Sequence, residues 1–92
     1  AVEFAALGYG IRVNSLHPAI VKTELGANVV RGFADVGLVA DEAQAESLMQ
    51  SMHPLGYGQP RDVASAILYL ASDAACWING AELVLDGGLS AR

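Results

Sequence analysis

The feature that most constrains this 92-residue chain is a pair of short segments, 11–17 and 81–85, that suit β-strands and end where a strand must stop. The first runs into Pro18, which has no N–H to continue a ladder, and the second runs into Asp-Gly-Gly at 86–88. The unbroken apolar run at 83–85 favours burial on both faces, as in a parallel sheet. The two segments therefore predict neighbouring parallel strands.

Residues 60–72 carry the pattern of the helix that must join two parallel strands. Pro60 suits the first helical turn, where its missing N–H is not needed, and Asp62 complements the positive end of the helix dipole. Apolar residues recur along the segment at helical spacing and form one stripe: Val63, Ala66, Ile67, Leu70 and Ala71. Because parallel strands need such a crossover, we predict a strand–helix–strand unit.

This unit leaves much of a sheet uncovered. A pair of strands exposes two edges, and both faces of a parallel sheet need helices. Residues 1–7 have the composition of a helix without an N-cap residue, and Gly8 or Gly10 can end that helix. The chain is 53% hydrophobic and only 16% charged, which leaves little polar surface for a small independent domain. We therefore expect a fragment of an α/β protein whose N-terminal part supplies further parallel strands.

A long segment, residues 23–59, interrupts the crossover after the first strand. It contains five glycines and one expected helix over 41–52. A long, glycine-containing insertion at the carboxyl end of a strand is typical of a substrate lid, although a plain surface loop has the same composition. We expect five apolar side chains to serve the lid: Leu25, Val29, Phe33, Met49 and Met52. They favour an apolar substrate, unless they only pack the faces of the helices.

Composition excludes several other classes of protein. A net charge of −5 disfavours binding to nucleic acid, and no apolar run reaches the roughly 18–20 residues that a membrane span needs. No secretion signal is recognisable, so we expect a cytoplasmic protein. Cys76, the single cysteine, is expected to be a small buried apolar residue rather than a reactive thiol. His17 and His53 lack metal-ligand spacing, so no metal site is expected.

The exit of the first strand is the best candidate for a binding site. Ligands of open α/β sheets bind beyond the carboxyl ends of the strands. Pro18 fixes the direction of the exit, and the backbone of residues 19–21 is free to bind an amide-bearing ligand once the ladder ends. The hydroxyl of Thr23 can both donate and accept. A simple strand-to-loop exit is the alternative interpretation.

The sequence contains no catalytic constellation. Ser15 lies outside any Gly-x-Ser-x-Gly motif, and a pair formed with His17 would lack an acid to orient the imidazole. The Gly-Tyr-Gly segments 8–10 and 56–58 lack the third glycine of a dinucleotide-binding loop. We therefore interpret both segments as turns.

A series of motifs, in order along nearly the whole chain, resembles one family. These are Gly-Ile-Arg-Val-Asn at 10–14, His17-Pro18, Thr23, Pro-Arg-Asp-Val-Ala at 60–64, Tyr-Leu-Ala-Ser-Asp at 69–73, Gly80 and Asp86-Gly87-Gly88. They resemble the C-terminal part of a short-chain dehydrogenase/reductase, most closely the bacterial alcohol, cyclopentanol and hydroxysteroid dehydrogenases. The resemblance implies that residues 1–92 are the C-terminal part of one NAD(P)-binding Rossmann-type domain. This segment would hold the last two strands of its doubly wound parallel sheet, the crossover helix and a lid over 23–59.

The resemblance also implies a reaction and a cofactor site. The reaction would be hydride transfer between a nicotinamide cofactor, NAD or NADP, and the hydroxyl/carbonyl pair of a small-molecule substrate. The nicotinamide carboxamide would be held by Pro18, Val21 through its backbone, and Thr23, with Ala19 standing where the family has glycine.

The family's catalytic Ser, Tyr and Lys would precede this segment. None of the three tyrosines is followed by a lysine four residues later, so the 92 residues alone are expected to be inactive. The full-length parent would be a homodimer or homotetramer. Two other interpretations remain open: a truncated, non-enzymatic remnant that acts only through packing or association, and an independent ligand-binding module.

Overall fold

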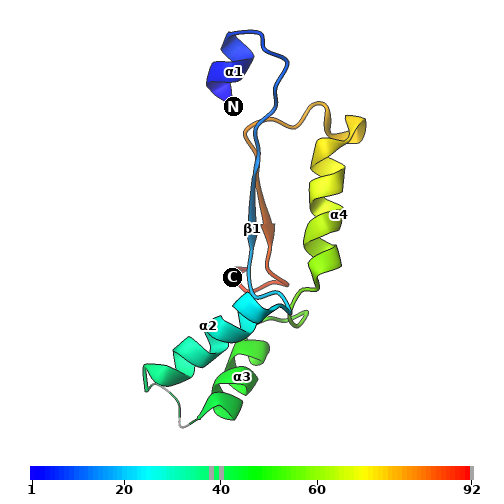
Figure 1. The fold of residues 1–92 in the computed structure, drawn as a ribbon. Coiled ribbons are helices and arrows are strands. Elements are labelled where there is room, and N and C mark those ends of the chain that lie inside the picture. The colour runs from blue at the N-terminus through cyan, green and yellow to red at the C-terminus, as the bar shows by residue number, and fades with distance from the viewer. Residues whose placement is uncertain (38, 40, 92) are drawn as a thin grey trace.

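The computed structural model describes residues 1–37, 39 and 41–91, so Leu38 and Ala40 of the expected lid, and Arg92, lie outside the described residues (Figure 1). In Figure 1, α4 runs beside the two strands, α2 and α3 lie beyond the carboxyl end of β1, and α1 lies at the opposite end. The elements in chain order are α1 (Val2–Ala6), β1 (Ser15–Pro18), α2 (Glu24–Asp35), α3 (Glu42–Ser51), α4 (Pro60–Ala71), the 3-10 helix η1 (Asp73–Ala75) and β2 (Glu82–Leu85).

The predicted parallel pair is confirmed, with both strands shorter than expected. Ser15 pairs with Glu82, and Pro18 pairs with Leu85 at the other end of the register. Before Ser15, the two segments are joined by one backbone hydrogen bond, from the Gly80 N–H to the Val13 carbonyl at 2.8 Å, and by side-chain contacts. The Val13 N–H donates to the Asn79 side chain at 3.0 Å. The strand pairing therefore begins four residues later than the apolar pattern indicates.

One face of this sheet is covered and the other is open. Leu16 and Leu83 pair in register and are half-buried, and Leu16 lines a hollow together with Ile67 and Leu70 of α4. His17 and Val84 pair on the opposite face, where Val84 is 52% exposed. The expected burial of β2 on both faces is therefore not met within this chain, because α4 covers only one of them.

The crossover helix α4 agrees closely with its sequence pattern. Pro60 occupies its first turn, and Asp62 accepts a hydrogen bond from the Gln59 N–H at 2.7 Å. This contact satisfies one of the N–H groups that a helix start leaves unpaired. At the other end of the molecule, Gly8 and Gly10 both adopt φ of +68° after α1, as the expected end of that helix requires.

The insertion holds two helices, of which the sequence pattern predicts only one. The expected helix over 41–52 is α3, capped by Asp41, which accepts from the Gln44 N–H at 2.8 Å. The other helix, α2, contains two glycines, which lower helix propensity by about 1 kcal/mol each relative to alanine. It forms because Val30 packs toward α3, where Ala45 is also fully buried. Tertiary packing thus overrides the local preference.

The buried core of this chain is small. Val30, Ala45 and Ala75 are its buried hydrophobic residues within the described part of the chain. The radius of gyration is 16.9 Å, whereas a compact domain of this length has about 12 Å. The surface is therefore that of a segment from a larger α/β fold. Among the described residues, no helix has the length and apolarity to cross a membrane.

The expectation that Cys76 is buried is wrong for this chain. Cys76 is exposed, and its neighbour Trp77 is 96% exposed. Both follow η1, which lies at the end of α4 and has no second layer over it (Figure 1). An apolar neighbourhood in the sequence indicates burial only when the elements that cover it are present.

Candidate functional site at the carboxyl ends of the strands

The ladder between the two strands ends at Ala19. Its N–H donates to the Leu85 carbonyl at 3.0 Å, directly after the paired Pro18. Among the described residues, every positive φ belongs to a glycine, so Ala19 has an ordinary backbone conformation. An alanine therefore fits at this position without backbone strain.

Beyond Ala19 the chain turns to pair with Gly58. The Gly58 N–H donates to the Ile20 carbonyl at 3.0 Å, and the Lys22 N–H donates to the Gly58 carbonyl at 2.8 Å. This parallel bridge leaves the N–H and carbonyl of Val21 directed away from Gly58. The Val21 N–H has no hydrogen-bond partner among the described residues. The Val21 N–H is thus a backbone donor that the strand exit leaves free.

Thr23 lies where the exit becomes α2, and its hydroxyl already has a structural role. It accepts from the Gly26 N–H at 3.1 Å and donates to the Val21 carbonyl at 3.3 Å. The sequence prediction of an exposed hydroxyl at this point agrees with the structure. Its N-cap role was not expected, since the helix that it caps was not expected. One acceptor position of the hydroxyl remains open.

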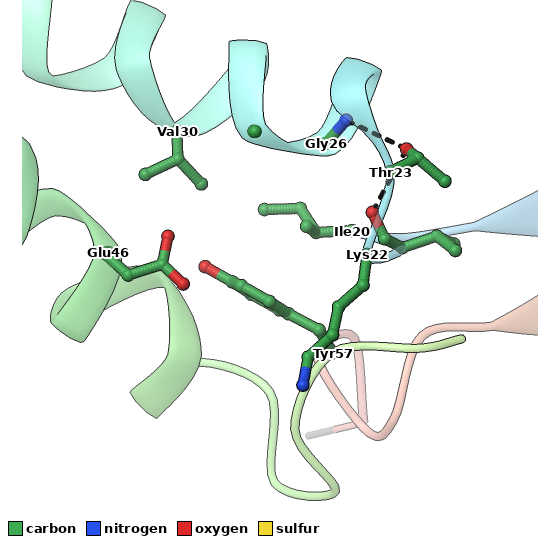
Figure 2. Close-up of a pocket in the computed structure, with 9 residues that line it drawn as sticks. Ile20, Lys22, Thr23, Gly26, Val30, Glu46 and Tyr57 are labelled. Carbon is green, nitrogen blue, oxygen red and sulfur yellow. Dashed lines mark hydrogen bonds between the residues drawn. The ribbon is translucent and has the colours of Figure 1, made fainter. Parts of the chain in front are cut away.

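A cavity of about 340 Å³ lies between the strand exit, the helices α2 and α3 and the loop that precedes α4 (Figure 2). Its lining is apolar except for one charged residue at each end and the hydroxyls of a threonine and a tyrosine: Ile20, Val21, Lys22, Thr23, Gly26, Ala27, Val30, Glu46 and Tyr57. Two of the predicted cofactor residues, Val21 and Thr23, therefore line the same cavity.

None of the five predicted lid side chains lines this cavity. Leu25 and Val29 lie on α2 but are 74% and 49% exposed. Phe33 and Met49 are half-buried on α2 and α3, and Met52 is the C-cap of α3 with 43% exposure. The lid helices instead present the small residues of α2 and Glu46 of α3 to the cavity.

Glu46 and Tyr57 face each other across the cavity, from α3 and from the loop before α4 (Figure 2). The Tyr57 hydroxyl is buried and lies beside the Glu46 carboxylate. Burial raises the pKa of Tyr57, and the negative charge of Glu46 and its interaction with the phenol proton raise it further. Sequence reasoning treated residues 56–58 only as a turn, and no spacing rule links Tyr57 to Glu46.

The base of this loop is also tied to the exit of β2. The Leu55 N–H donates to the Gly87 carbonyl at 2.9 Å. Asp86 shapes the turn, because its carboxylate accepts from the N–H groups of Gly88 and Ser90, each at 2.9 Å, and from the Ser90 hydroxyl. These hydrogen bonds, that of the Ser90 hydroxyl foremost, lower the pKa of Asp86.

Two negative expectations can be compared with the described residues. No group of three or more His, Cys, Asp or Glu side chains with metal-binding geometry is found among them. Ser15 Oγ and His17 Nε2 are 2.8 Å apart, so this pair does form on the open face of β1. The other ring nitrogen of His17 contacts no carboxylate in the described part of the chain, so a serine–histidine–acid triad is not assembled there.

Comparison with known proteins places this geometry in context. Residues 1–90 match the family described as Enoyl-(Acyl carrier protein) reductase. The chain is 37% identical to the NADP-dependent (R)-specific alcohol dehydrogenase of Lentilactobacillus kefiri, an alignment that covers 100% of this chain and 32% of that protein.

Solved structures agree in fold. The chain superposes on a short chain dehydrogenase family protein from Francisella tularensis with a TM-score of 0.82 and 29% identity, covering 100% of this chain and 37% of the other. It superposes on a 4-hydroxyisoleucine dehydrogenase complexed with NADH and succinate with a TM-score of 0.72 and 35% identity, covering 100% of this chain and 32% of the other. The chain thus spans about a third of the length of its relatives, and the α/β, Rossmann-type interpretation is confirmed.

Proposed function

The chain belongs to the short-chain dehydrogenase/reductase family, and we propose that it is the C-terminal part of an NAD(P)-dependent oxidoreductase that interconverts an alcohol and a carbonyl compound. A nicotinamide cofactor, when bound, supplies the two-electron donor or acceptor for this reaction. The relatives support both halves of the proposal, since one is an NADP-dependent alcohol dehydrogenase and another is a dehydrogenase complexed with NADH.

The observation that carries the proposal is the free N–H of Val21 at the edge of the cavity. A carboxamide offers a carbonyl oxygen and an NH₂ group, so it can accept from a backbone N–H while donating to an oxygen. Thr23 has such an oxygen, two residues further along. Pro18 and Ala19 would set the direction in which the chain leaves the sheet. These residues fit a nicotinamide carboxamide.

The substrate is proposed to be a small molecule with a hydroxyl or carbonyl group. The matching family is described as an enoyl reductase, whereas an alcohol dehydrogenase is among the relatives that are 37% identical to this chain. We therefore favour a carbonyl over a carbon–carbon double bond as the group that is reduced. The cofactor can be NAD or NADP, because the proposed contacts are with the nicotinamide carboxamide, which both cofactors share.

The chain's residues leave the acid–base part of the reaction to other residues of the complete protein. Lys22 is the only lysine, and it does not follow a tyrosine at the spacing of the family's Tyr-x-x-x-Lys. General acid–base catalysis contributes roughly 10²–10⁴ in rate. We therefore expect no turnover by the 92 residues alone. A cytoplasmic homodimer or homotetramer is the proposed setting of the complete enzyme.

The test is a turnover assay on the complete protein that contains this segment. NAD and NADP are each combined with primary and secondary alcohols, and NADH and NADPH with ketones and with an enoyl thioester. We expect alcohol oxidation and ketone reduction with one of the two cofactors. Reduction of the thioester alone would replace the proposed substrate class, and the absence of all cofactor turnover would favour the non-enzymatic remnant.

A further inference from the structure

The loop over residues 53–57 links α3 to the wall of the cavity, because it begins at the end of α3 and carries Tyr57, which lines the cavity. Its first residue, His53, is 4% exposed and is attached to the last turn of α3. The His53 N–H donates to the Gln50 carbonyl at 3.1 Å, and its ring Nδ1 donates to the Met49 carbonyl at 2.7 Å. Carbonyl groups at the end of a helix need such partners. His53 therefore fixes one end of the loop to α3.

Tyr57 attaches the other end of the loop to the middle of α3. Its ring packs edge-on against His53, with ring centres 5.3 Å apart at an angle of 86°. Its hydroxyl lies beside the Glu46 carboxylate, and Figure 2 shows the two groups directed toward each other. A phenol can donate to a carboxylate, which only accepts. The loop and α3 are thus joined at two places, and the part of the cavity wall that Tyr57 forms has to move with the loop.

The turn that follows β2, residues 86–90, holds this loop from the other side. The Leu55 N–H donates to the Gly87 carbonyl at 2.9 Å. Among the described residues, this is the one backbone hydrogen bond that joins residues 53–57 to a segment other than α3. The position of the loop relative to the strands therefore depends on the turn.

Two glycines of the turn lie directly against the loop. A Cβ on Gly87 would lie 3.0 Å from the carbonyl oxygen of Gly56, and a Cβ on Gly88 would lie 3.1 Å from Cγ of Pro54. Both glycines also have a positive φ, of 59° and 98°. Gly8 has a similar φ of 68°, but a Cβ there would meet nothing within 4 Å. Glycine in the turn is therefore required for the fit against the loop as well as for the backbone conformation.

Asp86 keeps the turn in this shape. Its carboxylate accepts from the N–H groups of Gly88 and Ser90, each at 2.9 Å, and from the Ser90 hydroxyl. These hydrogen bonds connect one side chain to residues two and four positions later, so they close the turn. Asp86 does not line the cavity that Tyr57 bounds. Any effect of Asp86 on that cavity therefore passes through the loop.

We propose that Asp86 is a positioning residue for substrate binding in the complete enzyme: it folds the turn 86–90, the turn holds the loop 53–57, and the loop places α3 and the Tyr57 wall of the cavity. This inference rests on the proposed function and deepens it. The cofactor side of the cavity is held separately, since Val21 is fixed by its bridge to Gly58 and by the close approach of Gly26. Asp86 should therefore govern the binding of the substrate and leave that of the cofactor unchanged.

Two variants disturb the turn in different ways. Asp86→Ala removes the three hydrogen bonds, and Gly87→Ala places a methyl group against the Gly56 carbonyl. The matched control for the first variant is Asp73→Ala, which removes an exposed carboxylate at the start of η1. The matched control for the second is Gly8→Ala, which imposes a positive φ on alanine without a contact.

Asp86→Asn is the conservative variant, and it serves as the test if Asp86→Ala does not fold. Its side-chain oxygen still accepts from the Gly88 N–H, whereas its NH₂ group cannot accept from Ser90. Its effects should therefore have the same direction as those of Asp86→Ala and be smaller.

The first measurement is amide hydrogen exchange in the complete protein, which requires no substrate. In the turn variants we expect residues 42–57 to exchange about 2–13-fold faster, the effect of one lost hydrogen bond on a local opening equilibrium. α4 should keep its parental rate. Both controls should keep the parental rate in residues 42–57.

The second measurement is the steady-state kinetics of alcohol oxidation, together with cofactor affinity from a fluorescence titration with NADH or NADPH. We expect KM for the alcohol to rise by about 2–13-fold in the turn variants, with kcat and cofactor affinity unchanged. A turn with a purely structural role would lower the melting temperature without separating KM from cofactor affinity.

Three results would overturn the inference. Exchange in α4 that rises as much as in residues 42–57 would mean that Asp86 stabilises the fold as a whole. Equal losses of cofactor affinity and substrate binding would assign the turn to the cofactor site. Unchanged exchange and KM in both turn variants would show that the loop is held without the turn. In each case the parent still oxidises alcohols, and the proposed function stands.

A parent that turns over no alcohol would instead contradict the proposed function and the role of Asp86 in substrate binding. Hydrogen exchange would then still decide whether the turn places α3, so the two failures can be told apart.

Discussion

An ideal Cβ on Gly26 would lie 2.2 Å from the carbonyl oxygen of Val21, which is closer than any two such atoms can approach. The first turn of α2 therefore rests directly on the strand exit. Only glycine allows this approach, and the glycine is in ordinary helical conformation, so its role is spatial rather than conformational. The position of the lid helix is thereby fixed against the proposed cofactor-binding backbone.

Gly26→Ala should destabilise the complete protein and weaken NADH binding, because either Val21 or the start of α2 must move. Overpacking of this kind costs about 1–3 kcal/mol. Gly32→Ala is the matched control in the same helix, since a Cβ at Gly32 meets nothing within 4 Å. The control should gain up to about 1 kcal/mol from helix propensity. Thermal unfolding and NADH titration measure both effects, and a Gly26 variant as stable as the Gly32 variant would contradict the packing argument.

Thr23→Ala should have two separable effects. Loss of the cap on α2 costs about 1 kcal/mol of stability, and loss of one hydrogen bond to the cofactor lowers its affinity by about 2–13-fold. Thr23→Ser keeps the hydroxyl and should retain both properties. Asp41→Ala removes the equivalent cap from α3, away from the strand exit, and should lose stability alone. Equal NADH affinities in the Thr23→Ala and Asp41→Ala variants would restrict Thr23 to capping.

The turn after β2 should loosen in acid. Hydrogen bonds from Ser90 and from the Gly88 N–H hold the pKa of Asp86 below its ordinary value of 3.8. A carboxylate with a lowered pKa in the folded state stabilises that state above its ordinary pKa, and this contribution is lost as the pH falls through the folded value. Between about pH 5 and pH 2, a range that extends below that ordinary value, the melting temperature of the complete protein should therefore fall less steeply for Asp86→Asn than for the parent. Parallel curves would show that another carboxylate dominates acid unfolding.

The outer surface of α4 should take part in self-association of the complete protein. Leu68 is 72% exposed and Tyr69 is 48% exposed, and the fully exposed Trp77 follows closely. Burial of such a surface about a twofold axis is the common closed arrangement of identical subunits. Leu68→Lys should lower the mass measured by light scattering. Val36→Lys, at a 67% exposed position at the end of α2, should leave the mass unchanged. An unchanged mass in the Leu68 variant, with reduced stability, would mean that the surface is covered within one subunit.

The sequence predicts the crossover unit well because its signals are local. Pro60 and Asp62 mark the start of α4 without reference to any other element, and Pro18 marks the end of β1. The parallel arrangement then follows from one helix between two strands. Gly8 and Gly10 likewise take the positive φ expected after a helix.

What the sequence does not predict depends on contacts between distant residues. α2 forms despite its glycines because Gly26 fits against Val21 and Val30 is buried near α3. The cavity lining follows from that docking, which turns Leu25 outward. The pair formed by Glu46 and Tyr57 requires both the lid helices and the loop before α4 to be in place. No spacing along the chain reports such a pair.

The two strands are joined across a long stretch of chain, with Asn14 accepting a hydrogen bond from the Ala81 N–H at a separation of 67 residues. Contacts of this length form late, because the entropy of closing a large loop must be overcome before the pairing stabilises it. During synthesis, β1 therefore keeps this edge unpaired until residues 82–85 have been added. The order of assembly is set by β2: α2, α3 and α4 can form first, and the strand pair that positions the strand exit closes only when β2 arrives.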